Sequence, residues 1–108
     1  MSNSIIDILS PLGVPVSLQT YSGPATTYIT FFHYLEQAES YANNEETSIG
    51  DYIQVDVWSK DNYSTLVKNV LETLKQAEFR RIYVTELYEK DTKLFHKIIR
   101  VFKLEEVK

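Results

Sequence analysis

One alternating stretch followed directly by an amphipathic stretch constrains the fold of this chain more than any other feature. The segment Asp51–Ser59 alternates between aliphatic side chains and polar or aromatic ones, which is the two-residue period of a β-strand with one apolar face. The segment Asn62–Glu78 has apolar residues every three or four positions, which is the period of a helix with one apolar stripe. Both apolar surfaces must be buried, so we expect the helix to pack on this strand. The residues expected to meet are Ile53, Val55, Val57, Leu66, Val67, Val70, Leu71, Leu74 and Ala77.

Four further segments have the composition of strands. Tyr28–Leu35 is aromatic and β-branched on both faces, so we place it centrally in a sheet. Val14–Tyr21 contains Pro15, which cannot donate to a ladder, so we place it at an edge. Arg81–Tyr88 and Leu94–Leu104, joined by a polar run, are typical of a hairpin. The predicted fold class is α+β: a two-layer, mixed or antiparallel sheet of about five strands with one long helix packed on one face and a short N-terminal helix.

The remaining segments complete a single predicted domain over residues 1–108. Ile5–Leu9 is expected to form the short helix, because Ser10–Gly13 supplies residues that break helices. The acidic segment 36–50 is expected to be a flexible loop that orders on assembly, with a short helix over Gln37–Ala42 as the alternative. Residues 105–108 are expected to be a frayed tail.

The residue types on which catalytic and metal sites depend are scarce in this chain. Cys is absent, and the only His residues are His33 and His96, each predicted within a strand and outside any catalytic or zinc motif. The three Gly residues lie too far apart to form a phosphate-binding loop. Paired carboxylates are inevitable by chance among 15 acidic residues, and solvated charge explains most of them. We therefore expect no enzyme, no catalytic residues, no metal and no cofactor.

Charge and hydropathy narrow the class of partner. The net charge is −4 and the Lys and Arg residues are scattered, which argues against a nucleic-acid-binding surface. The first residues lack the pattern of a signal peptide, and no apolar run approaches the ~20 residues that cross a bilayer. We expect a soluble protein that does not bind membranes.

Tyr is abundant, with eight residues, and Trp58 lies on the outward set of the alternating strand. Two interpretations carry similar weight: strands favour Tyr, and protein interfaces are enriched in Tyr and Trp. The second interpretation makes Tyr52, Gln54 and Trp58 a candidate interface.

The order of these elements resembles phage tail-completion, or tail-terminator, proteins. In that family a V-x-V-W-S strand leads directly into an amphipathic helix, and here Val-Asp-Val-Trp-Ser occupies residues 55–59 before the helix that carries Leu66–Leu71. Leu12–Val16 and Thr26–Phe31 resemble the opening of the family, with Thr27 where Pro is common. Leu87–Glu89 and Leu94–Arg100 resemble its last hairpin.

The resemblance implies a structural virion or prophage protein that forms a ring, commonly a hexamer although a monomer in isolation is compatible. Such a ring caps the tail tube, terminates its polymerisation and joins the tail to the head connector, while DNA passes through without specific binding. The implied location is the virion tail, assembled in the cytoplasm of a bacterial host. We expect the carboxylates of Glu36, Glu39, Glu45, Glu46 and Asp51 to line the lumen or rim and repel DNA. The alternatives are a head-side connector (an adaptor or stopper) and a small cytosolic protein-binding module.

Overall fold

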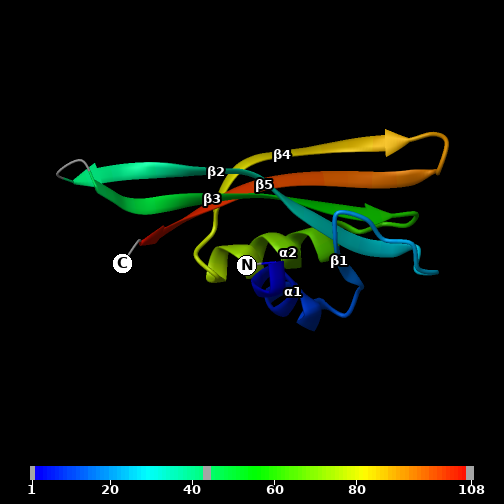
Figure 1. Cartoon of the computed structure of the whole chain (residues 1–108). Coiled ribbons are helices and arrows are strands. Elements are labelled where there is room, and N and C mark those ends of the chain that lie inside the picture. The colour runs from blue at the N-terminus through cyan, green and yellow to red at the C-terminus, as the bar shows by residue number, and fades with distance from the viewer. Residues whose placement is uncertain (1, 43–44, 107–108) are drawn as a thin grey trace.

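The computed structural model describes residues 2–42 and 45–106, and it describes only the backbone at 2–4, 35–42, 45–50 and 104–106. Figure 1 shows a sheet in one layer and both α-helices in a second layer on one of its faces. Within the described residues, neither helix is long and apolar enough to span a membrane. In chain order the elements are α1 (Ser2–Leu9), the 3-10 turn η1 (Ser10–Leu12), β1 (Val16–Leu18), β2 (Thr27–Ala42), β3 (Glu45–Ser59), α2 (Ser64–Gln76), β4 (Arg80–Glu89) and β5 (Leu94–Glu106).

The strands form one mixed sheet in the order β1-β2-β3-β5-β4. β1 pairs with β2 in parallel, and the other neighbours are antiparallel. β1 is a short edge strand, as expected from Pro15, whose carbonyl accepts the N–H of Ile29 at 2.8 Å although its own nitrogen cannot donate. The predicted α+β class, mixed sheet and short N-terminal helix are confirmed. The helix α2 has 13 residues and is shorter than the predicted Asn62–Glu78.

The core lies between the helices and the inner face of the sheet, which we define as the face that α1 and α2 cover. The expected contact between the alternating strand and the amphipathic helix is confirmed for the residues that form one buried cluster, and Leu66, Leu71 and Ala77 are only partly buried against it. Its central members are Ile53, Val55 and Val57 of β3 and Val67, Val70 and Leu74 of α2. The other members are Ile5, Leu9, Ile29, Phe31, Tyr63, Phe79, Ile99 and Val101.

The prediction of a loop over residues 36–50 is wrong where the structure describes this segment, and so is the alternative helix over Gln37–Ala42. β2 and β3 have 16 and 15 residues and pair as a hairpin as far as Ala42↔Glu45. The register shifts three times on the way, between His33 and Leu35, between Ala38 and Ser40, and between Ser40 and Tyr41. In Figure 1 the distal half of the hairpin extends beyond the helical layer. Neither helix covers this half of the hairpin in Figure 1, and its sequence lacks the alternation that marks a half-buried strand.

The predicted frayed tail also needs correction. Glu105 and Glu106 belong to β5 and pair with Ile49 and Ser48 of the same hairpin. Residues 107–108 lie outside the described part of the structure. This end of β5 pairs with β3 on one side only, because the pairing with β4 ends at Phe102.

The C-terminal end of α2 is a Schellman motif with an unusual residue at its left-handed position. Glu78 has φ 71° and donates its N–H to the carbonyl of Lys75 at 2.9 Å, while Phe79 donates to that of Leu74 at 3.0 Å. The buried side chains of Phe79 and Leu74 supply the apolar contact that accompanies this motif. Glycine is the residue that adopts this conformation without a Cβ penalty.

Replacing Glu78 with Gly should therefore stabilise the protein by roughly 0.5–1 kcal/mol, because the left-handed penalty is removed. Glu72→Gly, in the exposed middle of α2, is the matched control and should destabilise by about 1 kcal/mol. Urea unfolding of both variants measures the two changes. A Glu78→Gly variant that is less stable than wild type would contradict this description of the helix end.

Tyr63 links the start of α2 to the sheet. Its hydroxyl donates a 2.6 Å hydrogen bond to Oε1 of Glu86 on β4, and its ring is buried near that of Phe95. Burial raises the pKa of Tyr63 well above its usual value, and the hydrogen bond to the Glu86 carboxylate raises it further.

The raised pKa predicts a loss of stability at high pH. Above about pH 10 the unfolded chain releases the Tyr63 proton while the folded chain retains it, so the free energy of unfolding falls as pH rises. Tyr63→Phe should cost about 0.5–1.5 kcal/mol at neutral pH and should flatten this alkaline decline. Urea titrations at a series of pH values test both effects, and parallel declines in the two proteins would show that Tyr63 is not responsible.

Candidate functional site

The candidate interface residues lie on the outer face of the sheet, which is the face opposite α1 and α2. Tyr52, Gln54 and Trp58 of β3 alternate with the buried aliphatic residues, and they are flanked by β2 on one side and β5 on the other. The structure therefore brings the three together on one surface, as the sequence predicted. Their role in binding another protein stays a prediction.

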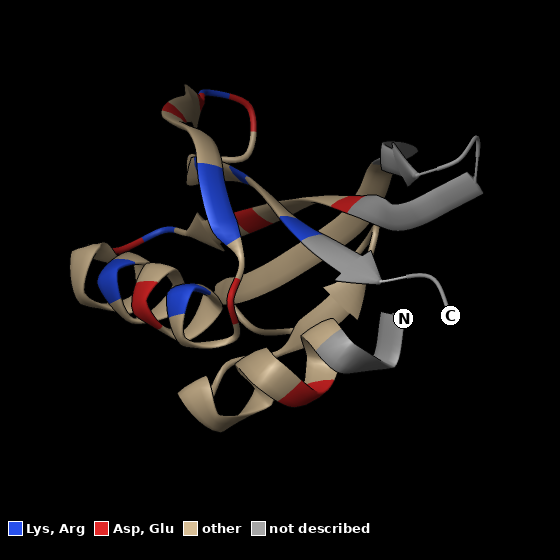
Figure 2. Ribbon diagram, turned by 90° about the vertical axis from the view of Figure 1, so that its left-hand side faces the viewer, with Lys and Arg blue, Asp and Glu red and all other residues tan. Residues whose placement is uncertain are grey.

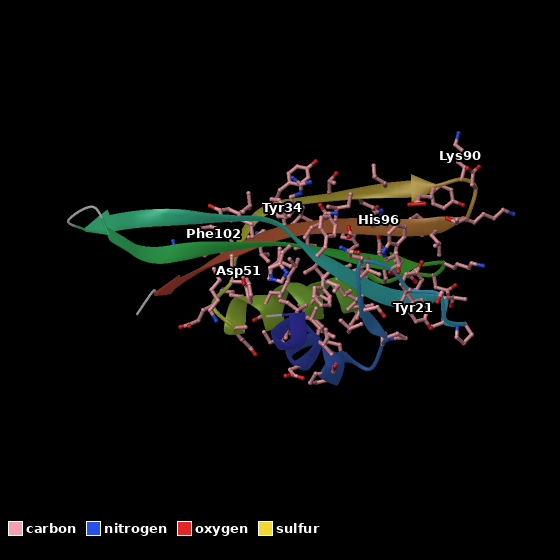
Figure 3. All side chains as sticks on the ribbon, in the orientation of Figure 1. Tyr21, Tyr34, Asp51, Lys90, His96 and Phe102 are labelled. Carbon is pink, nitrogen blue, oxygen red and sulfur yellow. The ribbon has the colours of Figure 1, made fainter. Side chains whose placement is uncertain are left out.

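An aromatic row, which we define as Tyr21, Tyr28, Trp58 and His96, crosses one end of the outer face. Neighbouring ring centroids lie 4.5 Å apart from Tyr21 to Tyr28, 6.0 Å from Tyr28 to Trp58 and 3.6 Å from Trp58 to His96, all in stacked orientations. The indole Nε1 of Trp58 donates to Oγ1 of Thr30 at 3.0 Å. Figure 3 shows Tyr21 and His96 toward the same end of the molecule. The stacking and this hydrogen bond fix the orientation of Trp58.

Beside the aromatic row lies a polar network, which we define as the buried Gln54, Asp56 and His96 and the exposed Arg100. Oδ1 of Asp56 accepts from Nε2 of Gln54 at 2.9 Å and lies 2.8 Å from Nε2 of His96. Arg100 donates from Nε to Oε1 of Gln54 at 3.0 Å. Gln54, Asp56 and His96 expose 9%, 5% and 8% of their surface, so each depends on these partners. The side chain of Gln54 is thus held inside the polar network and does not project from the outer face to meet a partner.

A second aromatic group lies farther along the outer face, toward the middle of the sheet (Figure 3). Tyr52 stacks on Phe102 with ring centroids 5.4 Å apart and meets Tyr34 edge-on at 6.0 Å. The guanidinium carbon of Arg100 lies 4.6 Å from the centre of the Tyr34 ring, which is a cation–π distance. In this way Arg100 connects the polar network to the second aromatic group.

Tyr28, on this face, is suited to contact and not to proton transfer at neutral pH. Burial raises the pKa of Tyr28, and the nearby Glu89 carboxylate and Tyr21 raise it further. A phenol of this kind stays neutral at physiological pH and is a poor general base there. It is suited to packing and hydrogen bonding.

The two His residues do not form a common site. His96 lies on the outer face, whereas His33 falls in the alternation of the inner face, where its Nε2 lies 3.1 Å from Oδ1 of Asp51 without the alignment of a hydrogen bond. Across the described ranges, no group of three or more His, Asp or Glu residues is arranged to hold a metal ion. The expectation of a protein without metal, cofactor or catalysis stays a prediction.

The acidic residues expected at a lumen are only partly described. Glu36, Glu39, Glu45 and Glu46 belong by backbone to the β2–β3 hairpin, and their side chains lie outside the described part of the structure. The side chain of Asp51 is only 13% exposed and lies against His33, so it is not a free surface charge. The lumen assignment therefore stays a prediction for the four Glu residues and loses support for Asp51.

Sequence reasoning missed a groove between α2 and the start of β4, which we call the basic groove. Its volume is about 700 Å³, its floor is apolar, and exposed cations line its rim. Figure 2 shows Lys and Arg of α2 close to those of β4. The adjacent pair Arg80-Arg81, directly after the amphipathic helix, was the available signal. The floor residues are Val67, Leu71, Leu74, Phe79 and Val101, and the charged rim residues are Lys68, Glu72, Lys75, Arg80 and Arg81.

Comparison with known proteins gives a likeness of fold. No protein-family model matches the chain, and no curated protein matches its sequence. Among solved structures, a chain described as "Virion of native gene transfer agent (GTA) particle" has a similar fold, with a TM-score of 0.53 and 14% sequence identity. The match covers 98% of this chain and 92% of that chain, so the two share the whole architecture and not a fragment of it.

Removing the carboxylate at the centre of the polar network should be costly. Asp56→Ala leaves Gln54 and His96 buried without their shared partner, and we expect a loss of about 1–3 kcal/mol in the free energy of unfolding. Asp61→Ala, at an exposed position after the same strand, should change stability by less than about 0.5 kcal/mol. Urea denaturation of the two variants measures the difference, and equal effects would mean that the network does not stabilise the outer face.

Proposed function

We propose that this protein is a structural component of a phage-like virion. The observation that carries the proposal is the shared fold, since this chain matches a chain of a gene transfer agent virion over nearly the full length of both. The outer face supports it independently, because its ordered aromatic and polar side chains are suited to protein contacts. A non-enzymatic role is part of the proposal. The raised pKa of Tyr28, which makes it a poor general base at neutral pH, agrees with that role.

Within that class we propose the role of a tail terminator. The motif that resembles this family, residues 55–59, has a structural explanation here: Val55 and Val57 enter the core and Trp58 joins the aromatic row. Ser59 lies 2.9 Å from the hydroxyl of Thr27 and accepts the N–H of Asp61 at 3.1 Å, which shapes the turn into α2. Copies of this protein would form a ring, commonly of six, that caps the tail tube, ends its growth and meets the head connector, with DNA passing through.

Particles assembled without this protein test the proposal. Electron microscopy should show overlong or unattached tails, because nothing would stop tube growth or present a surface to the head. Re-expression of the protein in the same host should restore tails of normal length. Tails of normal length on complete particles would exclude the tail role. Heads without attached tails beside separate tails of normal length would instead indicate the head-side connector.

A further inference from the structure

The charges of this chain are divided between two parts of the fold. All 11 Lys and Arg residues lie between Lys60 and Lys108, in the part that forms α2, β4 and β5. The first 59 residues, which form α1 and β1 to β3, contain no Lys or Arg. Apart from His33, the side chains in that part that ionise near neutral pH are all carboxylates. These carboxylates are Asp7, Glu36, Glu39, Glu45, Glu46, Asp51 and Asp56.

The acidic part includes an extended arm, which we define as residues 35–42 and 45–50 of the β2–β3 hairpin. Its four Glu residues are accompanied by apolar residues such as Leu35, Tyr41 and Ile49. The molecule measures 52 × 26 × 23 Å, and the arm extends along its long direction past the helices. β3 pairs with β5 as far as Ser48↔Glu106, so the arm is held in the sheet and does not bend back over its own α2.

The basic groove has the complementary chemistry. Lys68 and Lys75 of α2 and Arg80 and Arg81 of β4 are exposed at its rim, and Glu72 is the one acidic lining residue. The floor is formed by aliphatic side chains and Phe79. An acidic segment interspersed with apolar residues fits both properties, since opposite charges steer the encounter and apolar contacts hold it.

We propose that the basic groove of one copy binds the acidic arm of a second copy. The contact joins two different surfaces, so it is heterologous and can repeat from copy to copy until a ring closes. This proposal rests on the proposed function, because it names the two surfaces through which copies of the protein would form the ring. It also assigns the four Glu residues to a contact between subunits in place of a lumen lining.

The Cys-free sequence allows this contact to be tested by site-specific cross-linking of the full chain. One protein carries Ser40→Cys in the arm, and the other carries Glu72→Cys in the groove, so every arm carboxylate and every groove cation is retained. A short bismaleimide linker added to the mixture should yield about tenfold more heterodimer than a control pair, because docking raises the local concentration of the thiols. The control replaces Asp91, an exposed carboxylate in the β4–β5 turn, with Cys.

Charge reversal identifies the origin of the cross-link. Adding Arg80→Glu and Arg81→Glu to the groove protein should reduce the yield to the control level, and adding Glu45→Lys and Glu46→Lys to the arm protein should restore it. Reversal of two exposed cations outside the groove, Lys60→Glu and Lys90→Glu, should leave the yield unchanged. Raising NaCl to about 0.5 M should also lower it through screening.

Equal heterodimer yields from Glu72→Cys and Asp91→Cys would overturn the proposal, and so would reversal at Arg80 and Arg81 without effect. These outcomes are independent of the deletion experiment. Overlong tails together with failed cross-linking would leave the tail role standing and reject this contact. Efficient cross-linking, together with tails of normal length in particles that lack the protein, would support this contact and reject the tail role.

Discussion

Everything else in this structure depends on the burial of β3 against α2. β3 is the central strand, with β2 on one side and β5 on the other, and its residues Val55 and Val57 are fully buried. The turn from Ser59 to Ser64 is short, so the helix returns across the face of the strand that precedes it. The helix alone, at 13 residues, is too short to be stable in water, and its order comes from this packing.

This arrangement commits the aliphatic residues to the inner face and leaves the outer face to rings and polar groups. The outer face is nevertheless ordered, because Asp56 satisfies Gln54 and His96 together and Trp58 stacks on the same imidazole. A polar network of this kind is stable only when its members all find partners, and here the aromatic rings also screen it from water. The side chains of this face are therefore ordered in the isolated chain, which is the property that lowers the entropy cost of a protein contact.

The sequence was sufficient to predict the structure where burial determines which residues lie next to one another. The period of Ile53, Val55 and Val57 predicted both the strand and the face that α2 covers, and Pro15 predicted the edge. It was insufficient for the arm, because residues 36–42 carry no alternation in the sequence and extend past the helices, although their backbone is paired. The basic groove was missed for a different reason: Lys68 and Arg81 are brought together by the crossing of α2 and β4, and neither element alone indicates a surface.

The register shifts in the β2–β3 hairpin have a consequence for how a change in length would act on this protein. Each shift lets one strand of the hairpin advance by a residue relative to the other, and a single-residue change in a strand exchanges its two faces. The shifts begin after His33, beyond Ile29 and Phe31, whose side chains are fixed in the core. An insertion or deletion in this stretch would turn the distal arm over while the body of the domain kept its packing. A change in length alone would thus exchange the side chains that the arm presents on its two faces.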